Sequence, residues 1–390
     1  MKKTLLIFVI ILALLLALPV INLLRWTFQP KKPMDIILLD KTVPTLEREN
    51  HRAISWILNN ERYVDKQKKA NYSYLRDYFG WHPLRPLRDH EYEIHDYRLT
   101  EIINMADSND AIYIADTYGV FFNDWYKGIN KSRRSRMLYG GLNNTDYLLL
   151  KEMKDRNRLI ILEYNAFDYP TTAFNAFRIQ EKLGIKFNGW TGRYFSSLDT
   201  TGKDFPVWMT QMYRKEHKKP WTFTKSGIVL VNLKNIIVLE QGTHLTDPMP
   251  LIETDTANCK KLGVIPSVAF DNWFDIVEPT GCNVLSNYRL QTTAAGDTLL
   301  MDYNLGNVFP AVIQEAVTPS VYYFAGNFAY SDKPVWTAKF KGVEKFKNFF
   351  YSEKEDDPRR FFWLYYKPLV SSILDDYYHS HSGKVTAKDK

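Results

Sequence analysis

The sequence predicts an α/β protein in which a mostly parallel sheet is flanked by helices. Residues 159–162 form an uninterrupted apolar run between two helical patterns, at 144–155 and 172–183. A short apolar run in this setting is typical of a strand buried on both faces at the centre of a parallel sheet. The chain also has a predicted strand from Asp35 to Asp40, followed by a helix from Thr45 to Asn60 with Thr45 as its N-cap, which is the start of an α/β unit.

Antiparallel hairpins are predicted to extend this sheet in the second half of the chain. Residues 227–232 and 236–240 are two β-rich runs joined by a three-residue turn, Leu233 to Asn235. A second pair of β-rich runs covers residues 309–313 and 320–324. Both pairs have the length and composition of hairpin strands.

The N-terminus carries the clearest local pattern. Residues 4–24 contain no charge, follow two lysines, and are long enough to cross a bilayer as a helix. We interpret residues 1–26 as an uncleaved signal anchor; a cleaved signal peptide is the alternative, although no small-x-small cleavage site follows the apolar run. The lipid bilayer is then a partner, Trp26 and Lys32 lie at its interface, and the bulk of the chain lies outside the cytoplasm, held on the cytoplasmic (inner) membrane.

The rest of the chain divides by composition. We expect a short linker rich in proline and lysine at residues 27–34 and one α/β domain at residues 35–335. Aromatic and charged residues at about 63–98 are interpreted as an insertion over one end of the sheet. Residues 336–390 form an aromatic, basic tail with helical character, predicted to dock on the core.

The net charge of +7 is concentrated at the N-terminal flank. Five of the 51 lysine and arginine residues lie in the first 34 residues, which contain no acidic residue, so 46 basic residues face 44 acidic ones in the remainder. A nearly neutral body lacks the electrostatic footprint of a nucleic-acid-binding protein. We therefore expect no nucleic-acid partner.

The chain has two cysteines, Cys259 and Cys282. Outside the cytoplasm they are candidates for a disulfide bond, and the alternative is two buried free thiols. Because two lone cysteines without clustered histidines do not make a zinc site, we expect no metal.

Three carboxylates follow predicted strands: Asp40, Asp116 and Glu163. Ligands of parallel sheets lie beyond the carboxyl ends of the strands, where these side chains are expected to converge. A pair of carboxylates performs acid–base or nucleophilic chemistry in glycoside cleavage. The alternative is that they cap the following helices or pair with basic residues, since Asp after a strand is common turn chemistry.

A second set of residues is predicted to bind a substrate near these strand ends. Exposed aromatic faces bind sugar rings, arginine binds carboxylates or phosphates, and a histidine facing the cleft serves as a general base. The candidates are His51, Tyr118, Asn165, Trp190, Arg193 and Tyr194. The alternative assigns the aromatic residues to the core and His51 to a supporting position. No nucleotide-binding, zinc-protease or lipase motif is present in the sequence, and we expect no cofactor.

Two late segments carry a family resemblance. Phe309-Pro-Ala-Val-Ile313 and Val321-Tyr-Tyr-Phe-Ala-Gly-Asn327 resemble the closing strands of class I glutamine amidotransferase-like proteins, notably their trehalose-utilisation and β-galactosidase-associated branches. Residues 273–277 and 283–287 suit the preceding stretch. The resemblance spans about residues 35–330 and implies a flavodoxin-like α/β fold. The chain also resembles membrane-anchored bacterial envelope proteins, which implies no activity.

The family's reactive residues are missing from the matching positions. Active members place a cysteine in the turn after a central strand, and here that turn, Glu163 to Ala166, contains no cysteine, serine or threonine. No His-x-Glu pair occurs in the late segment. Cysteine-based amide hydrolysis needs a thiolate and a base, so the resemblance implies a scaffold without that reaction.

These observations lead to three alternative functions. The first is a membrane-anchored envelope protein with a degenerate amidotransferase-like domain that binds or scaffolds a glycan or another envelope component. The second is a carbohydrate-active hydrolase that uses the strand-end carboxylates. The third is a structural subunit of a membrane complex that uses the aromatic tail.

Overall fold

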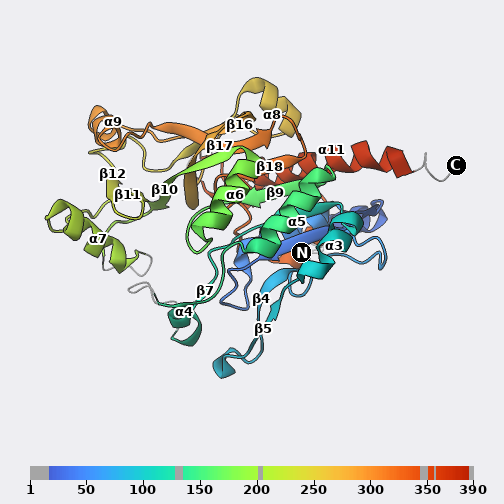
Figure 1. The fold of residues 1–390 in the computed structure, drawn as a ribbon. Coiled ribbons are helices and arrows are strands. Elements are labelled where there is room, and N and C mark those ends of the chain that lie inside the picture. The colour runs from blue at the N-terminus through green and yellow to red at the C-terminus, as the bar shows by residue number, and fades with distance from the viewer. Residues whose placement is uncertain (1–16, 128–134, 201–204, 343–349, 355–356, 386–390) are drawn as a thin grey trace, which may run out of the picture.

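The computed structural model describes residues 17–127, 135–200, 205–342, 350–354 and 357–385. Its main element is a ten-stranded sheet with helices on both faces, shown in Figure 1. In spatial order, the strands are β14 (Ser267–Ala269), β13 (Leu251–Glu253), β16 (Cys282–Arg289), β17 (Val308–Glu315), β18 (Val321–Phe324), β9 (Leu159–Glu163), β6 (Ala111–Ile114), β2 (Ile36–Asp40), β4 (Phe79–Pro83) and β5 (Tyr92–His95).

The centre of this sheet is parallel, as predicted, and its two sides are antiparallel. Strands β18, β9, β6, β2 and β4 pair in parallel, with Ile161 opposite Tyr113 and Tyr322. Strand β5 and the group β17, β16, β13 and β14 pair antiparallel on either side. The sheet is therefore mixed, and the hairpin of β17 and β18 lies where the sequence predicts it.

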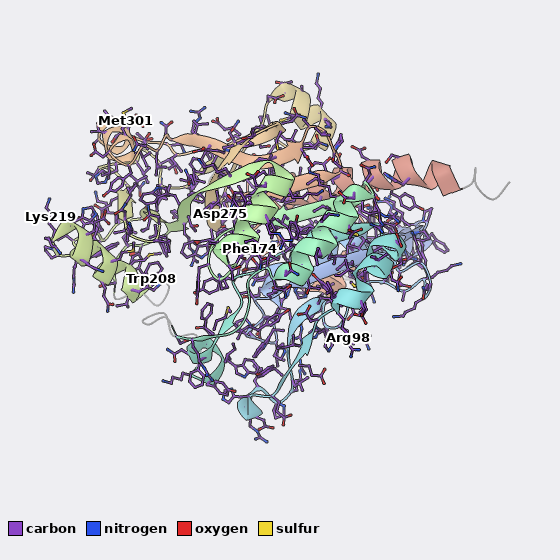
Figure 2. All side chains as sticks on the ribbon, in the orientation of Figure 1. Arg98, Phe174, Trp208, Lys219, Asp275 and Met301 are labelled. Carbon is purple, nitrogen blue, oxygen red and sulfur yellow. The ribbon has the colours of Figure 1, made fainter. Side chains whose placement is uncertain are left out.

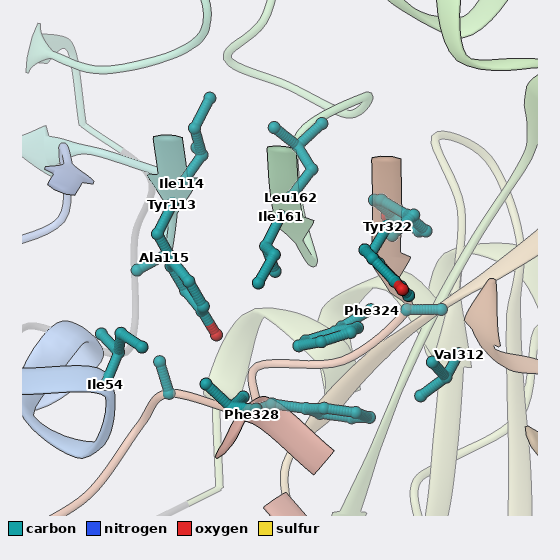
Figure 3. Packing of buried hydrophobic residues seen from close by; sticks show 14 of the residues in the cluster. Ile54, Tyr113, Ile114, Ala115, Ile161, Leu162, Val312, Tyr322, Phe324 and Phe328 are labelled. Carbon is teal, nitrogen blue, oxygen red and sulfur yellow. The ribbon is translucent and has the colours of Figure 1, made fainter. Parts of the chain in front are cut away.

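Strand β9 is buried along its whole length, as expected from its apolar run. Successive residues point to opposite faces of a strand. In Figure 3, Ile114 and Leu162 lie on one face of the sheet, and Tyr113 and Ile161 lie on the other, toward Phe328. Both faces thus need a covering layer.

Helices supply these two layers. On one face, α5 packs between α3 and α6 (Figure 1). On the other face, α2 contacts α11, and α11 contacts α8. The helices of these layers are α2 (Arg52–Asn60), α3 (Ile102–Ser108), α5 (Asn144–Asp155), α6 (Ala173–Leu183), α8 (Thr256–Leu262) and α11 (Lys367–Val385). Helix α9 (Ala294–Met301) lies apart from them and contacts strand β12 (Ile236–Glu240).

Helix α2 begins later than its sequence pattern predicts. A 3-10 turn, Glu49–His51, precedes α2, which starts at Arg52 rather than near Thr45. Arg48 has a left-handed backbone, with φ of 52°, which is incompatible with a continuous right-handed helix. Residues 42–48 are consequently a loop at the carboxyl end of β2.

A second, antiparallel sheet packs beside the first. Its strands, in order, are β12 (Ile236–Glu240), β11 (Gly227–Val231), β10 (Ile185–Phe195) and β15 (Trp273–Pro279). The predicted hairpin of residues 227–240 is present as β11 and β12. Helix α7 (Val207–His217) contacts β12 and helps enclose a small separate core that includes Phe205 and Met209.

Two segments are integrated more closely than the sequence predicts. Residues 63–98 were expected to be an insertion over the sheet, yet they contribute β4 and β5, which extend the sheet itself. The C-terminal segment forms a π-helix, Phe361–Tyr366, that continues into α11. Its residues Tyr365 and Leu369 are fully buried in the main core, because the face of the sheet that carries Tyr113 needs an apolar cover.

Residues 17–28 form a helix whose end rests on the α/β body. Trp26 Nε1 donates a hydrogen bond to the carbonyl of Asn59 at 2.8 Å, and Lys32 pairs with Asp375. These two residues, predicted to lie at a membrane interface, both contact the protein body. Within the described ranges, no helix is long and apolar enough to cross a membrane. Residues 4–16 of the predicted span lie outside those ranges.

Candidate functional site

An open cleft lies at the carboxyl ends of the central parallel strands. Its volume is about 820 Å³. One wall consists of the segments that follow β2, β6, β9 and β18, and the other includes residues of β10, β11, β15 and α7. This is the edge at which the sequence places the site, because ligands of parallel sheets bind beyond the carboxyl ends of the strands.

Of the three predicted carboxylates, Asp116 lines the cleft and the other two do not. Glu163 is fully buried, accepts a hydrogen bond from Tyr113 and accepts two more, each of 3.0 Å, from the backbone N–H groups of Phe328 and Ala329. Burial raises the pKa of Glu163 well above its usual range. Glu163 thus joins β9 to the segment after β18, and the expectation that it faces the cleft is wrong.

Asp40 is also fully buried, in a pair with His51. Asp40 Oδ2 lies 2.5 Å from His51 Nδ1, and His51 Nε2 lies 2.8 Å from the carbonyl of Tyr74. Both ring nitrogens therefore have partners inside the protein. The predicted role of His51 as a general base facing the cleft is wrong, because its ring is 1% exposed.

Asp116 is held by groups on two neighbouring strand ends. Its Oδ1 accepts hydrogen bonds from Thr42 Oγ1 at 2.9 Å and from the backbone N–H of Tyr118 at 2.8 Å. Burial raises the pKa of Asp116 to about 7, and the nearby charge of Asp40 adds to the effect. Asp116 therefore holds a proton more readily than an ordinary aspartate.

A buried carboxylate that the sequence did not single out supports the cleft floor. Asp275, labelled in Figure 2, lies on β15 and is fully buried. Its Oδ2 accepts hydrogen bonds of 2.9 Å from the backbone N–H of Asn165 and from Tyr323, and its Oδ1 accepts one from Thr191, also at 2.9 Å. Burial raises the pKa of Asp275 to about 7. The available signal was a lone charged residue inside an apolar strand, Trp273-Phe-Asp-Ile-Val277.

Asn165 lies in the turn after β9 and lines the cleft, as predicted. Its φ is 67°, a left-handed conformation that asparagine tolerates better than most residues. Its carbonyl accepts a hydrogen bond of 2.9 Å from Thr117 Oγ1. Its Nδ2 is buried and has no hydrogen-bond partner within the described part of the chain.

Aromatic side chains form much of the cleft wall. Tyr118, Tyr169 and Tyr330 line it and are 38%, 49% and 46% exposed. Trp273 also lines it and stacks on Tyr164, with ring centroids 6.3 Å apart. Tyr118 was predicted from the sequence, whereas Trp273 was noted only for its family resemblance.

The three predicted residues of β10 lie in different environments, and one of them lines the cleft. Arg193 lines the cleft, and its guanidinium carbon lies 5.6 Å from the centroid of the Trp273 ring. Trp190 is 5% exposed and packs edge-on against Tyr303, so its predicted role as a sugar-binding surface is wrong. Tyr194 is half-buried and is not among the cleft-lining residues, because adjacent residues of a strand point to opposite faces.

Charged side chains of both signs meet at one part of the cleft. Asp271 and Lys333 line it together with Arg193. Asp271 is accessible from the cleft, but the surrounding walls desolvate its carboxyl and raise its pKa, while Arg193 and Lys333 oppose that shift. Burial lowers the pKa of Lys333, whose Nζ lies 4.7 Å from the Phe362 ring centroid.

The two cysteines are free thiols. Cys259 Sγ donates to the carbonyl of Thr254 at 3.4 Å, whereas Cys282 Sγ lies 3.5 Å from the carbonyls of Leu183 and Gly184. The disulfide interpretation is therefore wrong, since the two side chains have different backbone partners on separate elements. Among the described residues, no group of three or more His, Cys, Asp or Glu side chains is arranged to hold a metal ion.

The sequence matches no protein-family model and no curated protein. A solved structure from Bacteroides uniformis ATCC 8492, provisionally named a thuA-like protein, is similar to the chain with a TM-score of 0.32 and 10% identity. The match covers 85% of this chain and 97% of that chain. A similarity at this level supports no statement about activity or ligand.

Proposed function

We propose that the cleft binds a saccharide. The observation that carries the proposal is the placement of three exposed tyrosine rings, Tyr118, Tyr169 and Tyr330, along one open cleft that also contains carboxylates. Tyrosine presents an apolar ring with a polar tip, and a sugar presents apolar C–H faces between hydroxyl groups. A saccharide therefore matches both the tyrosine rings and the carboxylates that line the cleft.

The charge of the cleft also favours a polar, nearly neutral ligand. Asp116, Asp168 and Asp271 lie in the same cleft as Arg193 and Lys333. Fixed charges of both signs hydrogen-bond hydroxyl groups, whereas a strongly charged ligand would meet repulsion from one set. The size of about 820 Å³ lies within the range of small-molecule sites and accommodates an oligosaccharide segment.

The proposal is tested by calorimetric titration of the protein with soluble trisaccharides: maltotriose, cellotriose and chitotriose. We expect at least one to bind, and Tyr118→Ala or Tyr330→Ala to weaken it at least about fivefold, as for an aromatic anchor. Phe174→Ala is the control, because Phe174 is 68% exposed on α6 and is not a cleft residue. Absence of binding to all three sugars, or binding that the tyrosine changes leave intact, would contradict the proposal.

We also propose a second candidate function, hydrolysis of the bound saccharide. It is supported by Asp116, a cleft carboxyl whose pKa of about 7 suits a general acid at neutral pH. We expect the unmodified protein to release reducing ends from the bound sugar. Asp116→Asn is expected to lose this activity and to retain sugar binding. Binding without cleavage by the unmodified protein would leave binding as the function.

We also propose, from the sequence, that the protein is anchored in a membrane. The uncharged run of residues 4–24 supports anchoring in the cytoplasmic (inner) membrane with the bulk of the chain outside the cytoplasm, where a glycan or another envelope component is available as a partner. Fractionation of the full chain after alkaline extraction tests it. Recovery in the soluble fraction would contradict anchoring.

A further inference from the structure

The helix of residues 17–28 touches the α/β body along one narrow stripe. Its buried residues are Asn22 and Trp26, one helical turn apart. Trp26 donates to Asn59, as described above, and the carbonyl of Asn22 accepts the backbone N–H of Lys341 at 3.2 Å. The large apolar side chains of this helix other than Trp26 are exposed: Leu18, Val20, Ile21, Leu23, Leu24 and Phe28. The helix therefore presents most of its apolar surface away from the body.

A short helix of the late chain lies beside this exposed surface. It is the 3-10 helix η4 (Val335–Lys339). Lys339 Nζ lies 6.0 Å from the centroid of the Trp26 ring. Because residues i and i+3 of a 3-10 helix lie on the same side, Trp336 lies on the side of η4 that carries Lys339, about 6 Å further along. Trp336 is 65% exposed and Phe28 is 80% exposed.

We propose that these residues seat the domain on an anionic phospholipid bilayer. We define the basal surface as Arg25, Phe28, Trp336 and Lys339, which are all exposed. The two aromatic rings lie among the lipid headgroups, and the two basic groups bind lipid phosphates. This inference rests on the proposed membrane anchoring, and it names the lipid class and the residues of the body that contact it.

The chemistry of the basal surface matches the interface of a bilayer. Tryptophan is enriched at this depth because its ring is apolar and its N–H is polar, and lysine and arginine reach the headgroups from there. Residues 17–34 and 333–342 contain basic residues and no acidic residue. The adjacent Glu61 is already paired with Lys341 at 2.7 Å. The surface charge is thus positive, which favours anionic lipids.

The distribution of apolar residues favours a bilayer over a second copy of the chain. Successive residues of an α-helix are rotated by about 100°, so Val20, Ile21, Leu23 and Leu24 point in several directions. A protein partner covers one stripe of a helix, whereas lipid surrounds it. The chain also continues from this helix into residues 4–16, which carry no charge. A bilayer accounts for both observations.

The test is fluorescence quenching of the full chain in lipid nanodiscs that contain phosphatidylcholine and phosphatidylglycerol. Phosphatidylcholine brominated high on its acyl chains quenches tryptophans that contact the bilayer. All ten tryptophans lie in the described ranges, and Trp336 is the most exposed. Trp336→Phe is therefore expected to remove at least about a third of the quenching. The matched control is Trp208→Phe on α7, labelled in Figure 2, which should leave the quenching unchanged.

A second comparison tests the preference for anionic lipid. The unmodified protein is expected to be quenched more strongly in discs that contain phosphatidylglycerol than in discs of phosphatidylcholine alone, and high salt should remove most of this difference. Lys339→Glu should abolish the difference. Lys219→Glu is the control, because Lys219 is an exposed lysine that follows α7 and is labelled in Figure 2. Thermal melting of each variant verifies folding.

The outcomes separate this inference from the anchoring on which it rests. A chain that stays in the discs, with equal quenching before and after Trp336→Phe, would overturn the basal surface and leave anchoring intact. Equal quenching in both lipid mixtures would overturn the anionic assignment.

A chain that does not enter the discs would overturn anchoring. Flotation of the same full chain with phosphatidylglycerol vesicles then decides the inference: binding that Trp336→Phe abolishes would support the basal surface, and absence of binding would overturn it. Sedimentation in detergent tests the remaining occupant. A dimer that Trp336→Glu dissociates would assign the surface to a second copy and overturn the lipid assignment.

Discussion

The backbone N–H of Asn165 donates a hydrogen bond of 2.9 Å to Oδ2 of Asp275, a residue 110 positions later in the chain. This contact joins the turn after the central strand β9 to β15 of the neighbouring sheet. Since Asp275 also accepts hydrogen bonds from Thr191 and Tyr323, one buried carboxylate fixes the relative position of several cleft elements.

Replacement of Asp275 by alanine is expected to destabilise the protein strongly. The change leaves three donors without an acceptor in the interior, which costs on the order of 3 kcal/mol of unfolding free energy. Urea denaturation measures the effect. Asp275→Asn is the matched control: it keeps an oxygen for Asn165 and Tyr323, and the Thr191 hydroxyl can turn to accept from the new amide. Equal losses for the two variants would contradict this role of the carboxylate.

Stability is expected to fall as the pH rises from about 5 to 7. Burial raises the pKa of Asp116 and of Asp275 to about 7 in the folded protein, above the unfolded value near 4. The folded state then binds more protons than the unfolded state over this interval. The stabilisation is complete below the unfolded pKa and is lost as the pH rises through the folded pKa, with a slope of up to about 1.4 kcal/mol per pH unit for each group.

Asp116→Asn isolates one of these two contributions. The variant cannot titrate at position 116, so its unfolding free energy relative to the unmodified protein should increase steadily between pH 5 and 7. Urea denaturation at four pH values supplies the comparison. A pH-independent difference between the two proteins would show that Asp116 does not titrate in this range.

Lys41→Met is expected to lower the unfolding free energy by about 3–5 kcal/mol, as is typical when one partner of a buried ion pair is removed. Lys41 is 1% exposed, and its Nζ lies 2.6 Å from Asp146 and 3.0 Å from the carbonyl of Gly141. Lys151→Met serves for comparison, because Lys151 forms its ion pairs with Glu152 and Asp155 in solvent and its loss should have far less effect. Similar midpoints in urea for both variants would refute the prediction.

Reducing agents are expected to leave the melting temperature unchanged. Cys259 and Cys282 are free thiols, and burial raises the pKa of each. As free thiols, both should react with iodoacetamide in the folded protein. The reaction should be slow at neutral pH, because the thiolate is the reactive form and a raised pKa leaves little of it. Intact-mass measurement under non-reducing conditions is expected to show two alkylated cysteines after unfolding. A species two mass units lighter that resists alkylation would indicate a disulfide bond.

Several parts of the fold could be predicted from local sequence. The apolar run of residues 159–162 became β9, and the two hairpins formed where β-rich runs flank short turns. These predictions succeeded because periodicity and turn composition act over a few residues. The start of α2 was misplaced because the left-handed Arg48 interrupts a helical pattern that continues in the sequence.

The candidate site was predicted in position but only partly in composition. The edge of the sheet, Asp116, Tyr118, Asn165 and Arg193 were expected, and all four residues line the cleft. His51, Asp40, Glu163 and Trp190 are buried and do not line the cleft. Nothing local distinguishes Asp116 from Glu163, since both follow an apolar strand.

The sequence by itself determined which segments become buried strands and which edge of the sheet carries polar residues, because both depend on the order of apolar and polar side chains along the chain. Only the tertiary structure decided which of those polar residues face the cleft. Glu163 is covered because Tyr113, Phe328 and Ala329 supply its hydrogen-bond donors, and Asn165 faces the cleft because Asp275 holds its backbone. Those partners lie 50 to 166 positions away, so burial and hydrogen bonding between distant segments set the site.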